Sequence, residues 1–214
     1  MELSELPSFD FESIIKSAVK KMDTHPVMDL PDDYGEFNLT SEFDRDSITA
    51  FVKSGGWAVG GYLEKRGVMY SAPRYADGRN IHMGIDIWAK AGEPVYAVLD
   101  GVVAYSTFQN DEGNYGGTLI LKHMVEGQEI FALYGHLSKE SLELHINGEK
   151  KKKGDVVGWL GEESENGNWP THLHYQLCIE DPGEPDMPGV VAKENLIPAR
   201  ERYPDPRILL GDIY

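Results

Sequence analysis

Four of the seven histidines in this chain lie in three short segments where polar and apolar residues alternate. The first segment, IHMGIDI at residues 81–87, places His82 and Asp86 four positions apart. The apolar residues between them favour a strand, and alternation along a strand puts both polar side chains on one face. Gly84, between the two, would leave open space above the sheet. An imidazole and a carboxylate at this spacing can bind one common metal ion.

The other two segments supply the remaining histidines of this group. In HLHYQL, at residues 172–177, His172 and His174 share one strand face, and the apolar residues that alternate with them pack on the other. One of these two imidazoles can bind a metal while the other stands beside its open coordination position. In YGHLS, at residues 134–138, His136 ends a strand.

The combination carries the interpretation, because a single histidine on a strand is usually an ordinary polar residue. Two imidazoles and one carboxylate form a ligand set that leaves a catalytic position open on zinc. The other histidines have no such neighbours, and we interpret them as surface or loop residues: His25, His123 and His145.

Composition excludes several classes of function. The chain has 20 Lys and Arg against 36 Asp and Glu, a net charge of −16, which disfavours nucleic acid, anionic membranes and a polyanionic cell wall. The one cysteine, Cys178, excludes an intramolecular disulfide and a zinc site built on thiolates. Its apolar surroundings predict a small core residue.

The first residues lack the basic start and apolar core of a secretory signal, and no apolar run is long enough to span a membrane. These features predict a cytoplasmic protein without membrane insertion, an interpretation that leaves export open.

Hydropathy and turn residues divide the chain into three parts. Residues 1–57 form a helical and loop-rich N-terminal extension, with helices expected within Phe11–Val19 and Ser47–Lys53. Residues 58–180 form a β domain, and residues 181–214 a proline-rich strap with a short turn near Ala199–Tyr203. No crossover helix follows the expected strands, which favours a mainly β, antiparallel fold. The expected strands are Ile85–Trp88, Val95–Val98, Gly101–Phe108, Thr118–His123, Glu129–Tyr134, Val156–Leu160 and His172–Ile179.

The motifs HMGIDIWAKAGEPVYAVLDGVV, LYGHLS and GDVVGWLG…THLHYQL resemble the zinc metallopeptidases of the lysostaphin/LytM type, over about residues 68–180. The resemblance implies that His82, Asp86 and His174 bind Zn²⁺. It also implies that His136 and His172 flank the zinc-bound water as the catalytic pair, with the base and the oxyanion stabiliser left unassigned between them.

The same resemblance implies an antiparallel barrel-sandwich hybrid with a duplicated hybrid motif. That duplication would account for an internal echo between GEPVYAVLDGVV and KKGDVVGWLGE, at residues 92–103 and 152–162. Further stretches, including LYGHLSKESLELHINGE and GWLGEESENGNWPTHLHYQ, are similar to the metallopeptidase-like domain of fusion proteins. In those fusions it lies between a kinase-like and an aminotransferase domain.

The sequence therefore predicts a zinc-dependent metallopeptidase that hydrolyses an amide bond of peptidoglycan, of a peptidoglycan fragment or of a small peptide. One alternative is a cytosolic zinc hydrolase of a small non-wall amide, which suits the acidic chain. Another is a non-catalytic binding module of the barrel-sandwich type. A lipoyl or biotinyl carrier would need a lysine at the hairpin Leu99-Asp100-Gly101, which has none. No oligomeric state is predicted.

Overall fold

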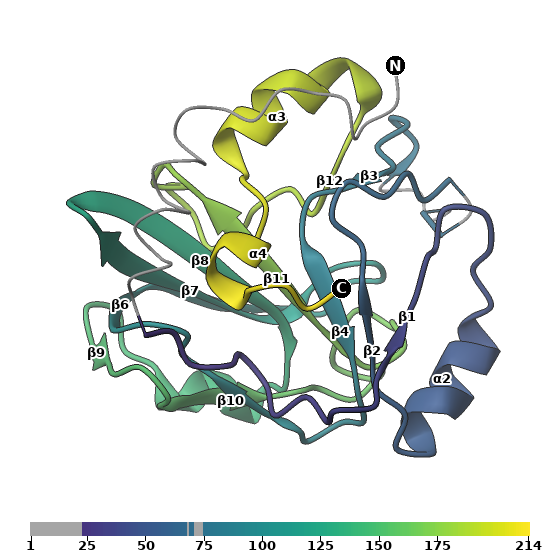
Figure 1. Ribbon diagram of the computed structural model, residues 1–214, viewed down its shortest axis with the longest axis horizontal. Helices are drawn as coiled ribbons and strands as arrows, with labels where there is room; N and C mark the ends of the chain where they lie inside the picture. Colours follow the sequence, from purple (N-terminus) through teal and green to yellow (C-terminus); the bar gives the residue numbers. More distant parts are fainter. Residues whose placement is uncertain (1–22, 68, 71–74) are drawn as a thin grey trace.

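An eight-stranded sheet dominates the computed structural model, which describes residues 23–67, 69–70 and 75–214 (Figure 1). The helix expected within Phe11–Val19 lies outside the described residues. The strands of the sheet follow one another in the order β1 (Gly35–Glu36), β2 (Ala58–Gly60), β4 (Ile85–Trp88), β11 (His172–Cys178), β8 (Gln128–Leu137), β7 (Gly116–Val125), β6 (Gly101–Gln109) and β9 (Lys150–Lys151).

Two short ribbons complete the β structure: β5 (Pro94–Tyr96) pairs with β10 (Val156–Trp159), and β3 (Ile81–His82) with β12 (Val190–Val191). Only the β1–β2 pair is parallel among the described strands. The prediction of a mainly β, antiparallel fold is confirmed, and the large sheet stays open in the part of the chain that the structure describes. The two halves of the internal echo supply β5 and β10, and these strands pair with each other.

Helical segments are short and lie outside the sheet. They are α2 (Arg45–Lys53), η3 (Glu140–Leu144), η4 (Lys193–Asn195), α3 (Leu196–Arg202) and α4 (Arg207–Leu210). Asp44 caps α2 by accepting a hydrogen bond from the Ser47 amide, and Gly55 and Gly56 follow its end. None of the helices among the described residues is long and apolar enough to cross a membrane.

Three expectations about local structure are wrong. The single strand expected through His82 and Asp86 is two strands, β3 and β4, interrupted at Met83 and Gly84. Each half takes a different partner, since His82 pairs with Val190 and Asp86 with His174.

The turn expected near Ala199–Tyr203 is the helix α3, which begins earlier, at Leu196. Pro198 does not prevent it, because proline is tolerated in the first turn of a helix. His123, expected at the surface, is 1% exposed on β7. Its Nδ1 bonds the Asp100 carbonyl, so a backbone partner satisfies one of the two nitrogens of the buried ring.

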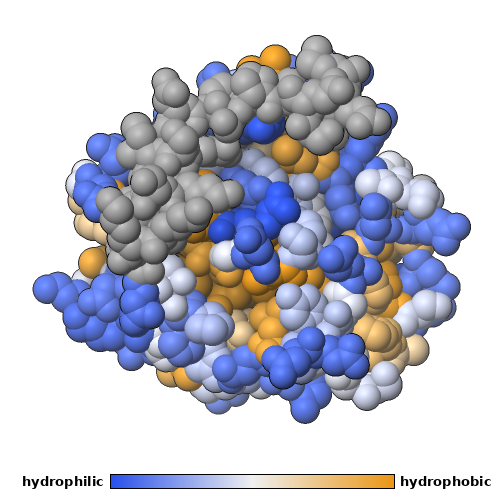
Figure 2. All heavy atoms as spheres, in the orientation of Figure 1, coloured by the Kyte–Doolittle hydropathy of each residue, from blue (hydrophilic) through white to orange (hydrophobic). Residues whose placement is uncertain are grey.

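The face in Figure 2 is mostly hydrophilic, with apolar side chains gathered near its middle. A hollow lined mainly by apolar residues lies between the described N-terminal segment and the C-terminal end of the chain, over Ile87 of β4. The expected core position of Cys178 is confirmed, because this side chain is fully buried.

Candidate metal centre

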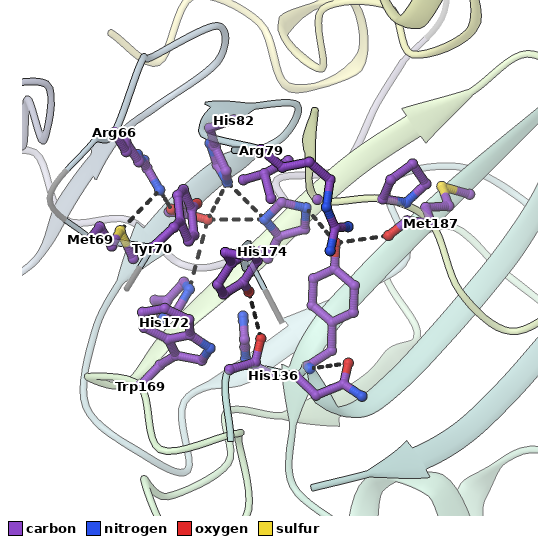
Figure 3. Close-up of a pocket in the computed structure, with 18 of the residues that line it drawn as sticks. Arg66, Met69, Tyr70, Arg79, His82, His136, Trp169, His172, His174 and Met187 are labelled. Carbon is purple, nitrogen blue, oxygen red and sulfur yellow. Dashed lines mark hydrogen bonds and ion pairs between the residues drawn. The ribbon is translucent and has the colours of Figure 1, made fainter. Parts of the chain in front are cut away.

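Three strands, β3, β4 and β11, bring three potential metal-ligand side chains to one point. The Nε2 atom of His82 lies 3.0 Å from Nδ1 of His174, and Oδ1 of Asp86 lies 3.3 Å and 3.2 Å from those two nitrogens. All three side chains are at most 3% exposed. They form the group of potential metal ligands found among the described residues (Figure 3).

The outer hydrogen bonds of the three side chains decide which atoms face inward. Nδ1 of His82 lies 2.9 Å from the Gly61 carbonyl, and Nε2 of His174 lies 3.0 Å from Oε1 of Gln176. Both partners are acceptors, so these ring nitrogens carry the protons and the opposite nitrogens present lone pairs. Such partners orient ligands in metal sites.

With the outer ring nitrogens protonated, Nε2 of His82, Nδ1 of His174 and Oδ1 of Asp86 face one another as three acceptors, with no proton between them. This arrangement is repulsive unless a cation lies between the atoms. Tetrahedral zinc with bonds of about 2.0–2.1 Å holds its ligand atoms about 3.3 Å apart. The observed separations of 3.0, 3.2 and 3.3 Å are close to that value, and the donor set of two imidazoles and a carboxylate fits zinc.

Gly84 makes room for a ligand and not for the metal itself. A Cβ atom at this position would lie 2.5 Å from Cε1 and 2.6 Å from Nε2 of His174. The space that the sequence assigned to an ion is therefore filled by the imidazole of a neighbouring strand.

Arg66 supplies the positive charge next to the carboxylate. It is fully buried, and its Nη1 donates to Oδ2 of Asp86 at 2.6 Å while its Nε donates to Glu64 at 2.8 Å. Burial alone would raise the pKa of Asp86, but the neighbouring His82 imidazole and the charge of Arg66 outweigh it and hold that pKa well below the usual range. Burial, reinforced by Arg66, lowers the pKa of His82 to about 4. The carboxylate is therefore ionised and the imidazole neutral, the states in which each binds a metal.

His136 and His172 lie together at the side of this centre, with ring centroids 4.2 Å apart. Nδ1 of His136 donates to the Asn166 carbonyl at 3.0 Å, and Nδ1 of His172 donates to the Pro170 carbonyl at 2.7 Å. Their Nε2 atoms are left without a proton, and Nε2 of His172 lies 3.8 Å from Oδ1 of Asp86. Burial lowers the pKa of both rings, so both are neutral near pH 7.

The backbone of His136 is unusual, with a φ of 63° in the left-handed region. Non-glycine residues in this region carry strain and occur at functional sites more often than elsewhere. The Tyr115 carbonyl accepts the His136 amide at 2.9 Å, and the His136 carbonyl accepts the Gly161 amide at 2.9 Å. Two backbone hydrogen bonds therefore hold the ring over the pocket at the end of β8.

The structure brings all five predicted residues into one pocket, together with residues that sequence reasoning missed. The pocket walls come from the segment before β3, the 113–115 loop, the 166–172 segment and the chain leading into β12. Its other lining residues include Arg66, Tyr70, Tyr75, Arg79, Tyr115, Trp169, Asp186 and Met187. Arg66 carries no local signal, because its link to Asp86 is made only by tertiary packing.

Tyr115 closes one side of the pocket. Its ring packs against the rings of His136 and His174, with centroids 5.4 and 5.1 Å away. Its hydroxyl donates to the Met187 carbonyl at 3.1 Å, and burial raises its pKa well above the usual value. The phenol is thus a neutral wall that joins the histidines to the segment before β12.

The central part of the chain is similar to known proteins. A family model described as Peptidase family M23 matches residues 80–185. The DD-carboxypeptidase/endopeptidase Mpg of Neisseria meningitidis is 37% identical over 113 residues, which are 52% of this chain and 23% of that protein. The peptidoglycan DD-endopeptidase ShyC of Vibrio cholerae is 31% identical over 98 residues, 46% of this chain and 20% of that protein.

Among solved structures, the catalytic domain of EnpA from Enterococcus faecalis has a TM-score of 0.44 at 24% identity, covering 64% of this chain and 89% of that one. The matched region spans about a quarter of the length of the curated relatives.

A buried group of two imidazoles and a carboxylate, which could hold a metal ion, thus lies beside two neutral histidines on a mainly β scaffold. Residues 80–185 form a peptidase family M23 domain, which confirms the resemblance to the lysostaphin/LytM type.

Proposed function

We propose that this protein is a zinc-dependent peptidase, with His82, Asp86 and His174 as the metal ligands. The observation that carries the proposal is the convergence of two imidazole nitrogens and one carboxylate oxygen at 3.0–3.3 Å from one another. A buried cation would relieve that arrangement, and the donor set fits zinc.

His136 and His172 are proposed as the catalytic pair. When bound, zinc would lower the pKa of a water toward about 7 and polarise a scissile carbonyl. A neutral imidazole with its Nδ1–H held by a backbone carbonyl can accept a proton at Nε2 and pass it to the leaving amine. The other ring can donate a hydrogen bond to the developing oxyanion once its own Nε2 carries a proton. Either histidine can take either role.

The proposed substrate is a peptide bond of the peptidoglycan type. Two of the relatives carry names that specify endopeptidase activity, one of them on peptidoglycan, and this supports that class. The net charge of −16 favours a short peptide or a wall fragment over an intact anionic wall, because like charges repel. The same negative charge makes a small amide that is not part of the cell wall the second candidate substrate.

Metal analysis and cleavage assays test the proposal together. Elemental analysis of the full chain should find about one zinc per molecule, and the His174→Ala variant should contain little. The purified protein would then be incubated with sacculi, with soluble muropeptides and with short peptides containing Gly and D-Ala. Zinc-dependent cleavage of any of these supports a peptidase. A protein that binds no zinc, or that cleaves equally well after chelation, contradicts the proposal.

A further inference from the structure

Residues 35–53, here called the N-terminal arm, lie outside the region that the family model matches, yet they contact the proposed site. The arm comprises β1, α2 and the segment between them. β1 extends the sheet through β2, which pairs with β4, the strand that carries Asp86. The arm is therefore built onto the edge of the sheet next to the metal centre (Figure 1).

The arm holds the loop that orients both catalytic histidines. The 163–170 loop supplies the two carbonyls, of Asn166 and Pro170, that accept the Nδ1–H groups of the pair. Arg45, the first residue of α2, donates from Nη2 to Glu163 at 2.7 Å and to Asn168 at 2.8 Å.

Further contacts support the same tie. Lys53, the last residue of α2, pairs with Glu163 at 3.2 Å. Phe43 meets Trp169 edge to face, with centroids 6.4 Å apart. Asn168 has a φ of 66°, so Arg45 holds a residue that sits in a strained backbone conformation.

A second, apolar route runs from the arm to His172. Phe51 of α2 packs on Phe37, with centroids 5.1 Å apart, and Phe37 packs on the edge of Trp88, 5.2 Å away. Trp88 in turn stacks on His172, with centroids 5.8 Å apart and an interplanar angle of 24°. The buried Ile48 and Val52 of α2 belong to the same apolar cluster as Trp88.

We infer that the N-terminal arm is a positioning element for the proposed catalytic pair, because it holds the 163–170 loop and backs the ring of His172. The catalytic role of the two histidines rests on the proposed function, but the orientation of their rings can be measured without any substrate. Arg45 is the residue whose loss isolates the effect. Its side chain is 39% exposed, so its removal leaves the core intact. It is 118 positions from Glu163 along the chain, so their contact is a tertiary one.

The test uses Arg45→Met, Glu163→Gln and the variant that combines these two substitutions. Lys122→Met is the control, because it removes an exposed ion pair with Glu129 elsewhere on the sheet. All proteins are full length and zinc-loaded. Nitrogen-15 NMR of the histidine rings follows the Nδ1–H protons of His136 and His172. In Arg45→Met these protons should exchange with water faster, while zinc content stays that of the wild type.

We expect kcat of Arg45→Met to fall about fivefold to tenfold with little change in KM, because misorientation of a general base acts on the transition state. Glu163→Gln should show a smaller loss, and the double variant less than the product of both, since the two residues share one contact. Lys122→Met should match the wild type.

Two outcomes overturn the inference. One is unchanged Nδ1–H exchange and unchanged kcat in Arg45→Met. The other is an equal change in all four site histidines with loss of zinc, which would make Arg45 a support of the whole fold. A wild-type protein without zinc or peptidase activity would instead contradict the proposed function, and the exchange data would still decide the positioning role.

Discussion

Arg66 donates a hydrogen bond to the Asp86 carboxylate oxygen that is not shared with the histidines, with 2.6 Å between Nη1 and Oδ2. The bond leaves Oδ1 alone to face His82 and His174. The carboxylate is thereby presented to the metal through one oxygen, and the charge of a fully buried guanidinium balances it.

Removing this guanidinium should weaken zinc binding. Replacing Arg66 with Met keeps the apolar stem and removes the charge, so we expect zinc affinity to fall about 10–100-fold, as for other outer partners of metal ligands. Competition with a chromogenic chelator measures the affinity, and circular dichroism of the apoprotein checks the fold. The zinc affinity of Arg66→Lys should lie between those of the wild type and Arg66→Met. Zinc affinity equal to the wild type in Arg66→Met would show that Asp86 needs no such partner.

Zinc content should distinguish variants of the proposed metal ligands from variants of the proposed catalytic histidines. His174→Ala removes a ligand, so both zinc and turnover should be lost. His136→Ala removes a proton acceptor and leaves the ligand set intact, so zinc should stay while kcat falls about 10²–10⁴-fold. Elemental analysis and steady-state kinetics on the same preparations measure both quantities. Full activity in His136→Ala would remove this residue from the catalytic pair.

A methyl group at Gly84 should disturb the metal centre. In Gly84→Ala the new Cβ would lie 2.5 Å from Cε1 of His174 and 2.9 Å from the Tyr175 carbonyl, so the imidazole or the strand must shift. We expect weaker zinc binding and a lower melting temperature. Gly67→Ala is the matched control, because a Cβ there meets nothing within 4 Å. The same zinc affinity in both variants would argue that His174 can move without cost.

Acid should destabilise the fold in part through His123. Burial lowers the pKa of this ring in the folded state, so below about pH 6.5 the unfolded chain binds a proton that the folded chain does not. The free energy of unfolding should therefore decrease as pH falls below that value, by at most about 1.4 kcal/mol per pH unit for one group. Urea unfolding between pH 7.5 and about 5 should show a shallower pH dependence for His123→Asn. Identical slopes in the two proteins would assign the acid sensitivity to other groups.

Much of the fold and the site was accessible from sequence, because period-two alternation and turn residues mark strands locally. The strand Ile85–Trp88 was predicted with its observed bounds, and the group of His82, Asp86 and His174 followed from spacing and resemblance. Spacing could not show that Gly84 separates two strands with different partners, since pairing is decided by β12, far along the chain.

The remaining features depend on tertiary contacts that leave no local pattern. His123 has no potential metal ligands near it along the chain, which favoured a surface or loop position, but tertiary packing buries its ring on β7. Arg66 stands among charged and glycine residues typical of a surface turn, and only the packed structure brings it to Asp86. The carbonyls that fix the tautomers of the histidines carry no side-chain signature at all.

The segment leading into β12 has a consequence for how this catalytic unit can be excised. The family match ends at residue 185, after all five predicted site residues. Yet Val190 pairs with His82, and the Met187 carbonyl accepts the hydroxyl of Tyr115. A fragment trimmed to the matched region would retain every ligand and lose the strand that fixes one of them. A fragment meant to keep the proposed metal site should therefore extend beyond the recognisable family segment, to at least Val191.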